Sequence, residues 1–98
     1  MSSVIIQRTP GQNKEFVAYY TDPKMTIRFG TPSNYVLNSQ KTEKDRQNYI
    51  KRHAVNEDYD NPRTAGALSR WLLWGTSRSI RENAESFGRR FGLKVSVK

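Results

Sequence analysis

The chain has 98 residues, enough for one domain (residues 1–98) with a modest core, and a net charge of +8 at pH 7, which favours polyanionic or acidic partners. It contains no cysteine, so disulfides, thiolate nucleophiles and cysteine-ligated zinc are excluded. The first residues lack the regions of a signal peptide, and the longest purely apolar run, residues 71–74, is far too short for a membrane span, so we expect no membrane insertion.

The N-terminal third of the chain predicts three short strands. Residues 3–8 (SVIIQR) and 14–20 (KEFVAYY) have the β-branched and aromatic composition of strands, and residues 25–29 (MTIRF) alternate strictly between apolar and polar side chains. Turn-forming residues separate these segments at 9–13 and 21–24. The second and third segments therefore predict a β-hairpin, to whose edge the first strand can add.

A first helix is predicted after the loop of residues 30–40. Thr42 can serve as N-cap, and Asp45 lies at the capping-box position, where Glu is the usual residue. Helical periodicity then places apolar and aromatic side chains on one face and lysines on the other. The first face holds Arg46, Tyr49, Ile50 and His53, and Lys44 and Lys51 lie away from it.

A second helix is predicted over residues 64–74. It is apolar on most sides, which indicates that it is buried. Asn61 or Asp60 can cap it, with Pro62 in its first turn. Gly75 is expected to end it.

The C-terminal segment predicts a third helix and a last strand. Thr76 or Ser77 is the expected N-cap, and Gly92 is the expected C-cap. The apolar residues of this helix fall at helical spacing, and those of residues 93–97 alternate with polar ones, as in a strand that could pair with the hairpin. The helical stripe consists of Ile80, Ala84, Phe87 and Phe91.

These segments together predict an α+β fold. We expect a small antiparallel sheet, made of the N-terminal hairpin plus the C-terminal strand, packed with three helices. Neither a repeat nor a long linker divides the chain, so we expect one domain over residues 1–98.

Two basic groups are candidate binding surfaces. The first lies in or beside the third helix, and the second surrounds the first helix; either could meet phosphates or acidic protein. An alternative interpretation of the first group is a solvated helix face neutralised by local pairs with Glu82 and Glu85. The first group is Arg78, Arg81, Arg89 and Arg90, and the second is Lys44, Lys51 and Arg52, with Lys41 nearby.

Four aromatic residues are candidates for an interface. Tyr19 and Tyr20, with Arg28, could stack on bases, but core or cross-strand packing is the favoured interpretation. Trp71 and Trp74 are also interpreted first as core, with one of them a candidate for exposure at an interface, where Trp is enriched.

His53 is the only histidine, so a catalytic triad or a site with several histidines is excluded by count. With Glu57, Asp58 and Asp60 it suggests a magnesium-dependent nuclease, in which His53 would be the general base. The favoured interpretation is that His53 continues the stripe of Tyr49 and that the acids lie in a solvated connector. We therefore expect no catalytic residues, no metal and no cofactor.

Three blocks in the middle of the chain resemble a known family. IRFG (residues 27–30) followed by Tyr35, DRQNYIKRH (45–53) and TAGALSRWLLW (64–74) are similar, in this order, to an uncharacterised family of short basic proteins encoded by large double-stranded DNA viruses of the phycodnavirus type. The resemblance covers residues 25–80. It implies a viral setting, in the virion and in the host cytoplasm or nucleus during assembly, but no functional residues can be carried over from it.

The leading hypothesis is therefore a small basic virion structural protein. As a minor capsid protein or a capsid-associated adaptor or cement, it would bind a larger viral coat protein or other virion proteins through surface burial and charge complementarity. The alternative is a sequence-independent nucleic-acid-binding protein of a large DNA virus, which would contact phosphates through the third helix and the C-terminal tail.

Overall fold

Three N-terminal strands form the first part of the sheet in the computed structural model, which describes residues 2–9, 14–21, 24–31 and 33–98. Strand β1 (Ser3–Arg8) pairs antiparallel with β2 (Phe16–Thr21), which pairs antiparallel with β3 (Lys24–Phe29). The predicted hairpin and the addition of the first strand to its edge are confirmed. The turn residues 10–13 and 22–23 lie outside the described residues.

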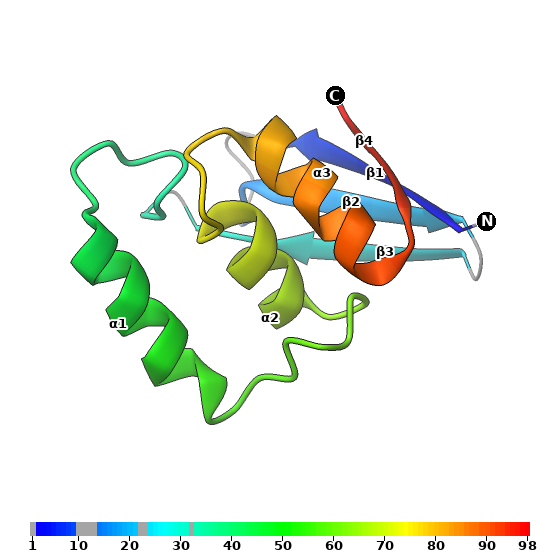
Figure 1. The fold of residues 1–98 in the computed structure, drawn as a ribbon. Coiled ribbons are helices and arrows are strands. Elements are labelled where there is room, and N and C mark those ends of the chain that lie inside the picture. Colours follow the sequence, from blue (N-terminus) through cyan, green and yellow to red (C-terminus); the bar gives the residue numbers. More distant parts are fainter. Residues whose placement is uncertain (1, 10–13, 22–23, 32) are drawn as a thin grey trace.

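Strand β4 (Lys94–Val97) completes a mixed sheet of order β3-β2-β1-β4. The α+β class and the association of the last strand with the N-terminal strands are confirmed, but the purely antiparallel pairing is wrong, because β4 runs parallel to β1. Helix α3 (Ile80–Phe91) lies across the sheet, and Gly92, with φ 66°, turns the chain back beside it (Figure 1). The direction of α3 thus fixes the direction of β4. The alternation of apolar and polar residues in β4 predicts a strand but not its direction.

Helix α1 (Glu43–Ala54) begins at the predicted cap. The Thr42 hydroxyl accepts a hydrogen bond from the Asp45 amide, and the Asp45 carboxylate accepts one from the Thr42 amide. The carboxylate of Asp therefore closes the capping box as Glu would. Of the helix residues only Arg46 is buried, and the exposed side of the helix carries Lys44 and Lys51, as the periodicity predicts.

The predicted second helix is present at nearly its full length but changes its winding. Helix α2 (Ala65–Leu68) runs directly into the π-helical turn η1 (Ser69–Leu73), in which the Trp74 amide donates to the Ser69 carbonyl. The N-cap is Thr64, whose hydroxyl accepts from the Ala67 amide. Asn61 does not cap it, because its side chain accepts from the Arg63 amide in a local turn.

The N-cap of α3 is Ser79, two residues later than the last predicted candidate, and its hydroxyl accepts from the Glu82 amide. The Ser77 hydroxyl instead accepts from the Ser79 amide, within the connecting turn. The predicted C-cap, Gly92, is confirmed. None of the helices in the described ranges is long and apolar enough to cross a lipid bilayer.

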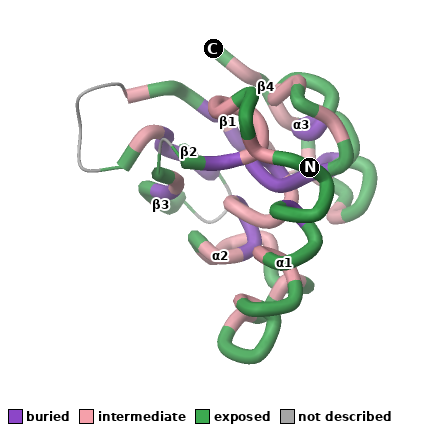
Figure 2. The backbone as a smooth tube through the Cα atoms, turned by 90° about the vertical axis from the view of Figure 1, so that its left-hand side faces the viewer, coloured by how far each residue is buried: buried purple, intermediate pink, exposed green. Residues whose placement is uncertain are grey.

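The core lies between one face of the sheet and the helices. Figure 2 shows buried residues concentrated in the sheet strands and in parts of α2 and α3, whereas α1 is largely exposed. Ring packing contributes to this core: the centroids of Phe16 and Phe29 are 5.6 Å apart, and those of Phe87 and Phe91 are 5.0 Å apart. Helix α1 therefore depends on a few side-chain contacts for its position.

Candidate functional site

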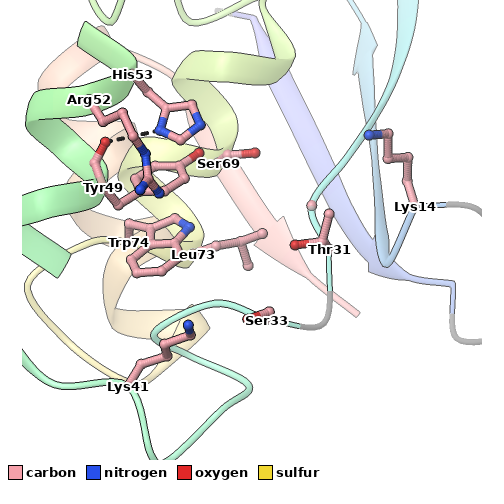
Figure 3. A pocket seen from close by; sticks show the side chains of 11 residues that line it. Lys14, Thr31, Ser33, Lys41, Tyr49, Arg52, His53, Ser69, Leu73 and Trp74 are labelled. Carbon is pink, nitrogen blue, oxygen red and sulfur yellow. Dashed lines mark hydrogen bonds between the residues drawn. The ribbon is translucent and has the colours of Figure 1, made fainter. Parts of the chain in front are cut away.

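A cavity of about 370 Å³ opens between α1, η1 and the loop that follows β3 (Figure 3). One wall is a column of stacked rings, in which the centroids of His53 and Tyr49 are 4.1 Å apart and those of Tyr49 and Trp74 4.2 Å. We call this space the basic cavity. It is lined by Lys14, Gly30, Thr31, Ser33, Lys41, Tyr49, Arg52, His53, Ser69, Leu73 and Trp74.

Three cationic side chains from separate segments line the basic cavity: Lys14 before β2, Lys41 before the cap of α1, and Arg52 in the last turn of α1. Within the described ranges, the lining includes no carboxylate. Elsewhere in the described part of the chain, Arg8 pairs with Glu15 at 3.6 Å and Arg46 pairs with Glu43 at 2.8 Å. Neither ion pair involves the three cations of the cavity. The cavity therefore has a surplus of positive charge.

One acid acts on this surplus from outside the lining. Two hydrogen bonds from Thr42, backbone and hydroxyl, are the main causes that lower the pKa of Asp45, and Lys41 adds to them. The carboxylate of Asp45 is thus occupied by the helix cap. Lys41, which lines the cavity, is therefore not the main partner of Asp45.

Hydroxyl groups complete the polar lining. Thr31 and Ser33 come from the loop after β3, and Ser69 comes from the start of η1. The loop can pass this close to η1 because Gly30 has φ 88° and no side chain: a Cβ there would lie 2.5 Å from Cδ1 of Leu73. Ammonium, guanidinium and hydroxyl donors without a carboxylate suit an anionic ligand rich in acceptor oxygens, such as a phosphate.

Arg46, which the sequence placed on the same helix face as Tyr49, holds α1 against η1. Its Nε donates to the carbonyl oxygens of Trp74 at 3.0 Å and Gly75 at 2.8 Å, and its Nη1 pairs with Glu43. Only 6% of its surface is exposed. A charged residue on an apolar stripe was the available signal, but the sequence did not show which carbonyls it would meet.

Arg78 does not lie on the face of α3, because the helix begins two residues later. Its guanidinium donates to the carbonyl oxygens of Tyr35, Asn38 and Lys41, and lies 4.0 Å from the centroid of the Tyr35 ring. It therefore anchors the loop before α1. These contacts use three of the five N–H donors of its guanidinium group.

The remaining predicted cations differ in their surroundings. Arg81, Arg89 and Arg90 are exposed on α3, and the local pairs with Glu82 and Glu85 that would neutralise them are not among the ion pairs of the described residues. Arg90 lies 3.9 Å from the centroid of the Trp71 ring. On α1 only Arg52 of the predicted group reaches the basic cavity; Lys44 and Lys51 lie outside its lining.

The aromatic candidates divide between core and surface. Tyr20 is buried and its hydroxyl donates to the Pro62 carbonyl, and Trp74 is buried in the ring column, so both follow the interpretation as core. Tyr19 points to the other face of the sheet and is 40% exposed. Trp71 is half-buried, and its indole Nε1 donates to the Tyr59 carbonyl at 2.8 Å.

His53 and the acids that follow it do not form a joint site. Its ring stacks on Tyr49, as its place on the helix stripe predicts, and Nδ1 lies 3.0 Å from the Tyr49 carbonyl oxygen. The Glu57 carboxylate lies beside Gly66 instead, where an added Cβ would be 1.8 Å from its oxygen. In the part of the chain that the structure describes, no three His, Asp or Glu side chains are grouped as a metal site would need.

Comparison with protein-family models, with curated proteins and with solved structures finds no match for this chain. The resemblance to the viral family thus stays a prediction from the three sequence blocks.

Alkaline pH is expected to weaken the fold through Tyr20 and Tyr49. Burial is the main cause and raises the pKa of each phenol to about 12. The charge of Arg63 lowers the pKa of Tyr20, and a hydrogen bond with Ser69 lowers that of Tyr49, but burial outweighs both effects. The unfolded phenols ionise near pH ~10, so stability present below that pH is lost as the pH rises toward ~12. Urea unfolding at increasing pH measures the decline, which Tyr20→Phe should reduce and Tyr19→Phe should leave unchanged.

Proposed function

We propose that the protein binds nucleic acid through its phosphates and without reading base sequence. The observation that carries this proposal is the basic cavity, which is lined by Lys14, Lys41 and Arg52 together with hydroxyl groups and by no carboxylate among the described residues. Phosphate contacts of this kind supply affinity and orientation but no sequence information. The exposed arginines of α3 and the net charge of +8 add long-range attraction.

A virion structural role is a second proposal. Docking on a coat protein would favour an apolar patch, because the cores of stable interfaces are apolar and poor in charge. Among the described residues, the exposed large hydrophobic side chains are Tyr19 in β2, Met25 in β3 and Val55 just after α1. This distribution favours phosphate contacts over coat-protein docking, and a nucleic-acid-binding protein can itself be a component of a virion.

The test is a salt titration of binding to duplex DNA. For the wild type, log Kd should rise linearly with log salt concentration, and each lost phosphate contact should reduce the slope by about 1. The double variant Lys41→Gln/Arg52→Gln should therefore lose about 2 from the slope and about tenfold or more in affinity.

The matched control is Lys44→Gln/Lys51→Gln, which removes the same charge around α1 from exposed positions outside the cavity lining. Its slope should change by less than half as much. Equal effects of both double variants would mean that charge alone, and not the basic cavity, governs binding. Absence of salt-dependent binding by the wild type would refute the proposed function.

A further inference from the structure

A second cavity, of about 280 Å³, lies beside the Trp71 side chain, between η1 and α3. We call it the arginine cavity, because its lining includes Arg70, Arg89 and Arg90 together with Thr76 and Ser86. Trp71 and Phe87 form apolar parts of its wall, and no carboxylate lines it within the described ranges. Three arginines and two residues with hydroxyl groups therefore line one small cavity.

Two arginines of this cavity, Arg70 and Arg90, contact the Trp71 ring. The guanidinium carbons of Arg70 and Arg90 lie 4.1 Å and 3.9 Å from the centroid of the Trp71 ring. The ring is itself fixed by the hydrogen bond to Tyr59 and by the edge of Phe91, with a centroid separation of 6.4 Å. Contact with a fixed ring restrains a guanidinium group, so less side-chain entropy is lost on binding.

Positive charge is crowded around Arg70. Its pKa is lowered first by burial, and both Arg46 and Arg90 lower it further, with Tyr59 acting in the opposite direction. Arg89, on α3, is the third arginine that lines the cavity. Its guanidinium donates to the Ser86 hydroxyl at 3.2 Å. Since no carboxylate of the described residues lines the cavity, a bound anion would reduce the repulsion between its arginines.

We propose that the arginine cavity is a binding site for a phosphate monoester, distinct from the basic cavity and from the backbone phosphates assigned to it. Three cations and two hydroxyl groups match the two charges and three terminal oxygens of a monoester better than the single charge of a phosphodiester. Arg89 and Arg90, which are exposed on α3 and line the cavity, can bind such a group through their N–H donors. The terminal phosphate of a nucleic-acid strand and a free nucleotide both carry this chemistry.

Calorimetry with inorganic phosphate and with a nucleoside monophosphate tests the site directly. The wild type should bind both, and Arg89→Gln/Arg90→Gln should weaken binding by about tenfold or more. Arg70 is left intact because it also donates to the Trp74 carbonyl. The matched control is Arg81→Gln, an exposed arginine of α3 outside this cavity, which should change affinity by less than about twofold.

Single-stranded oligonucleotides with a 5′-phosphate or a 5′-hydroxyl distinguish the two sources. A preference of about fivefold or more for the phosphorylated strand, lost in Arg89→Gln/Arg90→Gln, identifies a strand end; binding of the monophosphate without that preference identifies a free nucleotide. Lys41→Gln/Arg52→Gln should weaken both strands equally and keep the preference, which separates this site from the basic cavity. No binding of phosphate or monophosphate by the wild type, or an equal loss in Arg81→Gln, would overturn the proposal.

Discussion

Replacement of Arg46 by Met is expected to lower the free energy of unfolding by about 3 kcal/mol and to abolish much of the nucleic-acid binding. The Met side chain keeps the apolar stem but removes the donors to the carbonyls of Trp74 and Gly75. Trp74 retains a longer bond from Arg70, at 3.3 Å, whereas the Gly75 carbonyl loses the bond of 2.8 Å from Arg46. The substitution thus leaves a poorly satisfied acceptor at the end of η1.

The substitution should release α1 before it unfolds the rest of the protein, because Arg46 is the only buried residue of this helix. Hydrogen exchange should show faster exchange in α1 than in the sheet, and binding should fall because Arg52 and His53 move with the helix. Arg52→Met, on the same helix but exposed, should change stability by less than about 0.5 kcal/mol while still weakening binding. An Arg46→Met protein with wild-type exchange in α1 would contradict the anchoring role.

Local chemistry explains which parts of the fold were predictable. The alternating and β-rich segments specified the three N-terminal strands, and Thr42 with Asp45 specified the start of α1, since both signals act within a few residues. The direction of β4 and the π-helical winding of η1 depend on how α3 and Trp74 pack against distant elements. No pattern within those segments encodes that packing.

The same distinction applies to the candidate sites. Arg52 and the stripe of Tyr49 and His53 could be found by helical periodicity, but Lys14 joins them only because the sheet brings its strand end to the cavity. Arg78 illustrates the opposite case: its charge made it a candidate for binding, whereas its guanidinium, just before the N-cap Ser79, donates to loop carbonyls. Charge identifies a candidate, and tertiary contacts decide whether its donors are available.

Asn83 should be about as sensitive as Arg46, because it joins η1 to α3 from inside the core. Only 2% of its surface is exposed; its amide Nδ2 donates to the carbonyls of Leu72 at 2.9 Å and Ser77 at 2.8 Å, and its Oδ1 accepts from the Ser77 amide at 3.1 Å. Asn83→Leu would remove all three bonds from one buried position. We expect a loss of about 3 to 4 kcal/mol in the free energy of unfolding, measured by urea denaturation.

Asn83→Asp tests whether the donors, and not only the shape, are required. The carboxylate is nearly isosteric but presents oxygen to the carbonyls of Leu72 and Ser77, so this variant should be destabilised at neutral pH. Burial and the neighbouring acceptors both raise the pKa of the introduced carboxyl group, and its protonated form could donate one bond, so the deficit should shrink as the pH falls. A deficit independent of pH, or an Asn83→Leu protein as stable as the wild type, would show that the polar link between η1 and α3 is dispensable.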